Sequence, residues 1–328
     1  MHARSIDRLH AGNARLNGAT RVPSELPRHD KAIGRRSVPP VKLADPKLAT
    51  SPRDVCMAPP LRSVVIDKCG DKCMSTVTIV HDMSSDMFGR SNLIEKLEKD
   101  HRLVLFQNRG HYNIDHDKHD KVVKEGDPEN LSIAMPDYIP DPATCKKLGI
   151  DPYSIEMFSN DVRRVMDEHG IEKTDIVGFS LGAFVAQAFA ARHPERTDRI
   201  AIGKSFSRYS DLIVAGKGLI RGPVLTVGYW LWCNLRQRVY KERDYGCSVP
   251  MAVVDDIAAS IVDADMKKYQ IDIKAPTLVL HCVDDDLFGT KIDSIPNMTR
   301  APMTFCGHLF NLRNDAMYDK IADFLKRE

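Results

Sequence analysis

The chain has 328 residues, 43% of them hydrophobic, and a formal net charge of +2, so it is long enough and apolar enough to bury a large core. A charge so close to zero gives no reason to expect nucleic-acid binding, and no run approaches the roughly 20 apolar residues that a transmembrane segment needs. The first residues also lack the apolar core of a secretion signal, so a cytoplasmic protein is expected.

The basic residues concentrate at the amino-terminal end. Residues 1–54 contain eleven Lys and Arg against five Asp and Glu, an excess of six that leaves about −4 for the remainder. Residues 1–57 are rich in Arg, Pro, Ser and Asn and show no apolar period, which predicts a disordered basic extension. Organelle targeting is the alternative, and the acidic residues and prolines of this segment weigh against it.

The eight cysteines suggest no metal centre, because none has a partner pair at zinc-ligand spacing. We expect mostly reduced thiols, with a local disulfide between Cys69 and Cys73 as the alternative. Residues 115–120 combine Asp and His, but lysine interrupts them and nothing buries them, so a solvated loop is favoured over a metal site. No metal or other cofactor is expected.

From residue 61 onward, apolar runs and helical patterns alternate, which is typical of a parallel sheet with crossover helices. The pattern predicts strands over 62–67, 75–82 and 102–107, with a helix over 91–98 between the last two. Residues 113–151 are polar and proline-punctuated, which indicates a surface insertion. A helix over 155–169, ended by Gly170, then leads to a strand over 174–177.

The second half continues the alternation around a long helical insertion. A strand is predicted at 199–202, a buried strand at 275–282, a last strand with its turn at 303–308 and a terminal helix at 315–326. Between them, residues 204–270 are mainly helical and hold both tryptophans, Trp230 and Trp232. We predict a lid in which these two side chains line an apolar pocket; core packing without substrate contact and membrane-surface contact are the alternatives.

The stretch that organises the chain is Gly178-Phe-Ser180-Leu-Gly182. It lies between an apolar run and a helical pattern, the context in which G-x-S-x-G forms a strained turn that exposes a serine hydroxyl. An ordinary glycine-bounded turn is the alternative. A serine hydroxyl needs a base, and the base needs an orienting carboxylate. One of Asp284 to Asp286 and then His308 follow Ser180 in the chain.

These motifs resemble the α/β-hydrolase superfamily over roughly residues 61–328. The resemblance implies a mostly parallel, twisted sheet with helices on both faces, formed by residues 58–203 and 271–328, with residues 204–270 as a helical lid. Carried over onto this chain, the superfamily pattern makes Ser180 the nucleophile, His308 the base and Asp285 the acid, nine residues after Pro276. It also makes the backbone amides of Met83 and Leu181 the oxyanion hole.

One departure bears on function. Asp82 follows His81 where the superfamily usually has glycine, and a carboxylate there would oppose a developing oxyanion; both residues are expected at the substrate site. The resemblance implies hydrolysis of a carboxylic ester or related acyl bond of a small apolar molecule, with no nucleic-acid partner. The alternatives are a catalytically impaired binding protein and a serine-assisted biosynthetic cyclase or lyase. Oligomeric state is left open.

Overall fold

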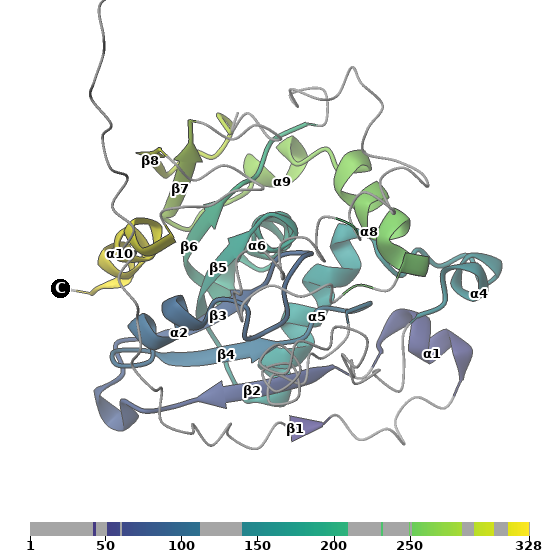
Figure 1. Ribbon diagram of the computed structural model, residues 1–328, viewed down its shortest axis with the longest axis horizontal. Helices are drawn as coiled ribbons and strands as arrows, with labels where there is room; N and C mark the ends of the chain where they lie inside the picture. The colour runs from purple at the N-terminus through teal and green to yellow at the C-terminus, as the bar shows by residue number, and fades with distance from the viewer. Residues whose placement is uncertain are drawn as a thin grey trace, which may run out of the picture. The chain divides into compact units, whose positions relative to one another are not determined.

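The computed structural model describes residues 42–43, 51–59, 61–111, 140–208, 231, 249, 251–283, 292–304 and 314–327, all within one compact unit, Pro39–Glu328. Its strands form one sheet in the order β1-β2-β4-β3-β5-β6-β7-β8 (Figure 1). The strands are β1 (Lys42–Leu43), β2 (Arg62–Ile66), β3 (Thr76–Val80), β4 (Arg102–Phe106), β5 (Thr174–Phe179), β6 (Thr197–Gly203), β7 (Thr277–Cys282) and β8 (Met298–Met303).

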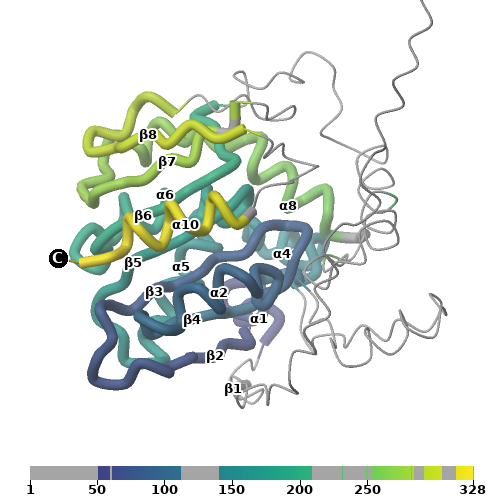
Figure 2. Tube along the Cα trace, turned by 60° about the vertical axis from the view of Figure 1, so that its left-hand side comes forward, coloured from purple at the N-terminus to yellow at the C-terminus, as the bar shows by residue number. Residues whose placement is uncertain are grey.

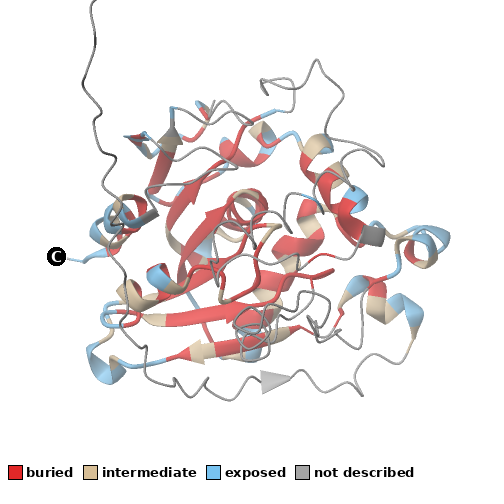
Figure 3. Cartoon of the chain, viewed as in Figure 1, coloured by how far each residue is buried: buried red, intermediate tan, exposed pale blue. Residues whose placement is uncertain are grey.

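The strand directions confirm the predicted fold class. β1 and β2 pair antiparallel with their neighbours at one edge, and every pair from β4 through β8 is parallel. Strands such as β5 are buried along their whole length, as parallel strands covered on both faces must be (Figure 3). The described helices are α1 (Pro52–Met57), α2 (Ser91–Leu97), α4 (Pro142–Lys147), α5 (Ile155–Glu168), α6 (Leu181–Arg192), α8 (Met251–Asp263), α9 (Lys267–Gln270) and α10 (Asn314–Leu325), with short 3-10 turns η2 (Gly70–Lys72) and η4 (Pro194–Arg196).

Helices cover both faces of the sheet. Figure 2 shows helices on either side of the strands. One cluster of buried apolar side chains joins the sheet to α5, α6, α8 and α9, and a second joins it to α2 and α10. α6 is buried through most of its length because it lies between the sheet and other helices, which suits its continuous apolar sequence. α5 has one apolar face and is capped by Ser154, whose side chain accepts the amide hydrogen of Met157.

The predicted lid, residues 204–270, is described only at its two ends. The carboxyl end, α8 and α9, packs on the core through buried side chains such as Val253 and Ile257. A buried chain of hydrogen bonds joins both ends to α6: Gln187 donates to Ser205, Gln270 donates to Gln187, and Ser207 donates to Gln270. Trp230, Trp232 and most of the residues between these ends lie outside the described residues, so the lid itself stays a prediction.

The folded part begins earlier than residue 58. Within the predicted extension, Lys42 and Leu43 pair with β2, and α1 is capped by the side chain of Ser51. Cys56 of α1 is buried and forms a disulfide with Cys145 of α4. Propensity alone would not hold so short a helix, and this covalent tie between distant segments supplies the missing stabilisation.

A second disulfide joins Cys69 and Cys73 around the η2 turn. The expectation of mostly reduced thiols is therefore wrong for these four cysteines, and the alternative of a local Cys69–Cys73 disulfide is confirmed. Spacing could suggest the local pair, but it could not reveal the Cys56–Cys145 pair, whose partners are 89 residues apart.

Candidate active site

The backbone at Ser180 has the strained geometry that the motif predicts. Ser180 follows β5 directly, precedes α6, and has φ 50° and ψ −122°. A side chain at Gly178 would collide with the backbone of Gly182, and one at Gly182 would collide with the carbonyl of Val80. The turn is therefore possible only with glycine at both positions, and it places Ser180 at the amino-terminal end of α6, where the helix dipole favours negative charge.

The register of the sheet places the predicted oxyanion loop beside this turn. β3 and β5 are parallel neighbours in which Val80 pairs with Gly178. His81, Asp82 and Met83 therefore follow β3 at the carboxyl ends of the strands, where Ser180 follows β5. The close approach of Gly182 to the carbonyls of Val80 and His81 holds the loop against the start of α6. The backbone amides of Met83 and Leu181 thus belong to two segments that pack against each other.

The carboxylate of Asp82, within this loop, is bound by hydrogen-bond donors on both oxygens. Its Oδ2 accepts a hydrogen bond from the Arg90 guanidinium, and its Oδ1 accepts from the amide and hydroxyl of Ser84 (2.9 and 2.7 Å). Burial would raise the pKa of this carboxyl, but Arg90 and Ser84 outweigh burial and hold the pKa below its usual range. Asp82 is therefore an ionised carboxylate whose charge is compensated inside the protein.

His81 is a structural histidine in this arrangement. Its Nδ1 donates to the carbonyl of Asp82 (2.8 Å), and its Nε2 accepts the amide hydrogen of Asn108 (2.9 Å). Burial is the main cause that lowers the pKa of His81, so the ring is neutral. With both ring nitrogens in hydrogen bonds, His81 shapes the loop, and the Asp82 carboxylate is likewise bound by Arg90 and Ser84. The substrate contact expected of these two residues stays a prediction.

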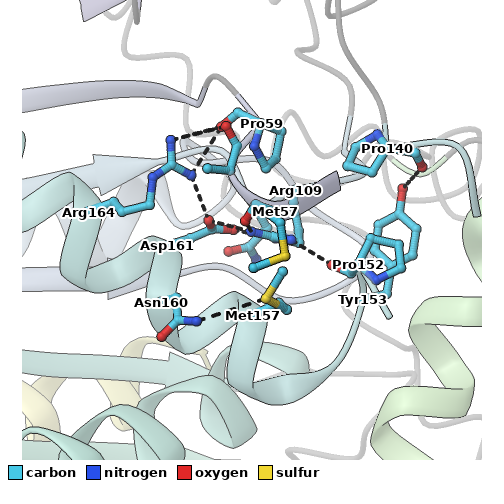
Figure 4. A network of polar contacts seen from close by, with 12 residues as sticks. Met57, Pro59, Arg109, Pro140, Pro152, Tyr153, Met157, Asn160, Asp161 and Arg164 are labelled. Carbon is cyan, nitrogen blue, oxygen red and sulfur yellow. Dashed lines mark hydrogen bonds and ion pairs between the residues drawn. The ribbon is translucent and has the colours of Figure 1, made fainter. Parts of the chain in front are cut away.

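The loop after β4 is tied to the amino-terminal segment by Arg109 (Figure 4). This buried guanidinium donates to both carboxylate oxygens of Asp161 (2.6 and 2.7 Å), to the carbonyl of Pro152 (2.8 Å) and to the carbonyls of Cys56 and Met57 (3.2 Å each). Gly110, with φ 74°, lies against the Tyr153 ring, so a side chain there would collide with it. The Asn-Arg-Gly sequence thus organises the loop and the start of the fold.

Sequence reasoning did not assign two charged residues near Ser180. Arg90 lies eight residues after Asp82. The segment between them is a loop, so this separation does not predict that the two side chains meet. Lys204 follows β6, whose Gly203 pairs with Phe179, so it neighbours Ser180 across the sheet. Lys204 is buried with φ 57°, and within the described part of the chain it shares a positive φ only with Ser180 among non-glycine residues.

Four predicted site residues lie outside the described residues: Asp285, His308, Trp230 and Trp232. The strands before the first two end at Cys282 in β7 and Met303 in β8. Both strands are parallel to β5 and β6, so they end at the edge of the sheet where Ser180 lies. The topology thus brings the chain to the end of the sheet where Ser180 lies shortly before Asp285 and shortly before His308.

The described residues offer no built metal centre and no membrane span. Among them, Asp67, Cys69 and Cys73 are the group whose ligand atoms lie close enough to share an ion, but the two sulfur atoms form a disulfide. In the same parts of the chain, no helix is both long and apolar enough to cross a bilayer. The Asp and His stretch at 115–120 lies outside the described residues.

Comparison with known proteins agrees with this geometry. Residues 79–207 match the alpha/beta hydrolase fold family. The putative carbamate hydrolase RutD of Caulobacter sp. (strain K31) is 31% identical over 200 residues, which cover 54% of this chain and 75% of that protein. A homoserine O-acetyltransferase of Thermus thermophilus is 32% identical over 87 residues, covering 26% of this chain and 23% of that protein.

A solved structure gives the same result at the level of the fold. An enol-lactonase from Burkholderia xenovorans LB400 is similar with a TM-score of 0.58 at 19% identity, covering 82% of this chain and 97% of that chain. The chain belongs to the α/β hydrolase family. Hydrolase activity is the general function that this membership supports.

Proposed function

We propose that this protein is a serine hydrolase that cleaves a carboxylic ester or a related acyl bond of a small apolar molecule. The observation that carries the proposal is the backbone of Ser180, strained at φ 50° and set at the amino-terminal end of α6. Such strain persists only where the surrounding structure enforces it, and it is concentrated at functional sites. Here it serves to present a hydroxyl where a nucleophile is needed.

In the proposed reaction, Ser180 attacks the acyl carbon while His308 removes its proton. Asp285 holds the imidazole in the correct tautomer and stabilises the imidazolium that forms. His308 then protonates the leaving group, and water releases the acyl group from Ser180 in a second, equivalent step. The parallel ends of β5, β7 and β8 at one edge of the sheet support this assignment.

The oxyanion would be bound by the amides of Met83 and Leu181. Support comes from the packing of residues 81–83 against the start of α6 and from the positive end of that helix. The Asp82–Arg90 ion pair weighs against a catalytically impaired protein, because the carboxylate is compensated and bound by donors on both oxygens. Trp230 and Trp232 are proposed to line the pocket for the apolar part of the substrate.

A fluorophosphonate probe and an ester panel test this function. The expected results are a covalent adduct on Ser180, identified by mass spectrometry, and turnover of p-nitrophenyl esters from acetate to octanoate. Ser180→Ala, which should fold normally, is the control and should show neither. Absence of both labelling and turnover in the wild type would refute the serine hydrolase proposal.

The similarity to an acetyltransferase favours a second candidate, transfer of the acyl group to an alcohol instead of water. Both reactions share the acyl-enzyme on Ser180, so the probe does not separate them. Adding an alcohol acceptor to the ester assay does, because a transferase would form mainly the new ester whereas a hydrolase would form mainly the free acid. A lyase or cyclase would be labelled but would turn over few of the esters.

A further inference from the structure

Arg90 is a buried arginine at the junction of three segments near Ser180. It lies at the start of α2, where its carbonyl accepts the amide hydrogen of Ile94 (2.9 Å). Its side chain is only 4% exposed. An arginine is rarely buried this far unless its charge is paired, so the groups that surround it indicate why it is there.

The contacts of Arg90 reach three separate parts of the fold. The guanidinium pairs with Asp82, donates to the hydroxyl of Tyr318 (3.3 Å), and lies over the ring of Phe179 with its Cζ 4.6 Å from the ring centroid. The Phe179 and Tyr318 rings also meet edge to face, with centroids 6.4 Å apart. One side chain therefore connects the loop after β3, the end of β5 and helix α10.

Each of these three segments leads into the proposed catalytic machinery. Asp82 directly precedes Met83, and Phe179 directly precedes Ser180. Tyr318 lies on α10, which begins six residues after His308. A shift of Arg90 would act on all three, and small errors in the placement of reacting groups lower catalytic rates strongly.

The charge on Asp82 determines whether the loss of Arg90 would slow or speed the proposed reaction. Its carboxylate lies one residue from a proposed oxyanion donor, in a buried site where charges are poorly screened. With Arg90 present, the pair has no net charge. Without Arg90, Asp82 would lose its paired cation, and Lys204 acts on its charge more weakly than Arg90 does. The remaining negative charge would oppose the oxyanion of the transition state, the opposite of what an oxyanion hole provides.

We propose that Arg90 is a positioning residue that acts through Asp82. It balances the charge of this ionised carboxylate and holds it toward α2, so that the amide of Met83 can serve in the oxyanion hole. The proposal rests on the proposed serine hydrolase function. It explains how the chain tolerates an aspartate where the superfamily usually has glycine: the arginine compensates the substitution from within the same loop region.

The test compares Arg90→Gln with the double variant Asp82→Asn/Arg90→Gln in the p-nitrophenyl ester assay, with active sites counted by fluorophosphonate labelling. We expect Arg90→Gln to lower kcat about 100-fold, the size of one oxyanion contact, with KM changed less than about threefold. The double variant should recover at least about tenfold of that loss. Equal kcat per active site in Arg90→Gln and wild type, or no recovery in the double variant, would overturn the proposal.

Arg199→Gln is a matched control. Arg199 also lies against a phenylalanine ring, Phe324, and donates to its carbonyl on α10, but it sits toward the opposite end of β6 from Ser180. It should lower the melting temperature without changing kcat per active site.

If Arg90→Gln fails to fold, Arg90→Lys keeps the charge and loses the planar contact with Phe179. It should then retain kcat within about fivefold because the compensating charge is what matters; a loss of about 100-fold in folded Arg90→Lys would overturn the proposal. An inactive, unlabelled wild type would instead refute the serine hydrolase function, and the role of Arg90 would fall with it.

Discussion

The two ends of the parallel strands carry similar residue types in different backbone settings. At the carboxyl end, Ser180 lies beside His81 and Asp82. At the amino end, Ser75, His101 and Asp175 meet: the Ser75 hydroxyl donates to Asp175 (2.5 Å) and accepts from Nδ1 of His101 (2.9 Å). A search for serine, histidine and aspartate together would find both clusters.

The difference lies in the backbone and in the order of the contacts. Ser75 is placed between the histidine and the aspartate, so its proton already goes to a carboxylate and His101 cannot act as its base. Its backbone has no positive φ and it starts no helix, whereas Ser180 has both features. A strained turn at a helix terminus, more than the set of residue types, is thus what separates Ser180, the proposed nucleophile, from the structural serine Ser75.

The largest expected effect separates the two serines. Ser180→Ala should lower kcat at least about 10⁴-fold and abolish fluorophosphonate labelling, because it removes the attacking atom. Ser75→Ala should leave kcat within about twofold. Steady-state kinetics on p-nitrophenyl acetate measure both, and a large loss of kcat per labelled site in Ser75→Ala would break the distinction between the two ends.

The second-largest effect is expected for Asp285, the proposed acid. Asp285→Asn should lower kcat about 10⁴-fold with little change in KM, since a neutral amide favours the wrong histidine tautomer. Asp284→Asn and Asp286→Asn are matched controls from the same loop and should cost less than about tenfold. A larger loss in either control would move the role of the acid to that residue.

Asp82→Gly restores the residue usual in the superfamily and yet should not raise kcat. It leaves the Arg90 guanidinium buried without its carboxylate, which should lower the free energy of unfolding by about 3–5 kcal/mol. Urea denaturation measures the change. The control is Asp319→Asn, which breaks a more exposed ion pair with Lys96 and should change stability by less than about 1 kcal/mol. A stable Asp82→Gly with raised kcat would contradict the compensated pair.

The smallest effect is expected at the amino end. Burial raises the pKa of Asp175, so the folded state binds its proton more tightly than the unfolded state does. The stability from this group is present below the unfolded pKa and is lost as pH rises through the folded pKa. Asp175→Asn, which retains an acceptor for Ser75, should therefore raise stability at pH 7 by up to about 1 kcal/mol and leave kcat unchanged. Urea unfolding at pH 4 and pH 7 measures how the free energy of unfolding changes with pH in the wild type and in the variant. A loss of stability in Asp175→Asn at pH 7 would show that the ionised carboxylate is needed.

Local sequence patterns determined much of the fold and the centre of the site. The apolar run before Gly178, the glycines around Ser180 and the helical spacing after it predicted β5, the strained turn and α6, because these features depend on neighbours in the chain. The predicted end of α5, before Gly170, lies within one residue of the observed end at Glu168 for the same reason.

Contacts between distant segments could be decided only by the tertiary structure. Spacing cannot show that Cys56 meets Cys145, or that Arg109 reaches the carbonyls of α1. The effect of Asp82 was also open, because the sign of a buried charge's influence depends on its partners, and its partner Arg90 follows in a loop without periodicity. The sequence by itself determined which serine is presented; the packing of α2, β5 and α10 around Arg90 decided the electrostatic setting in which that serine lies.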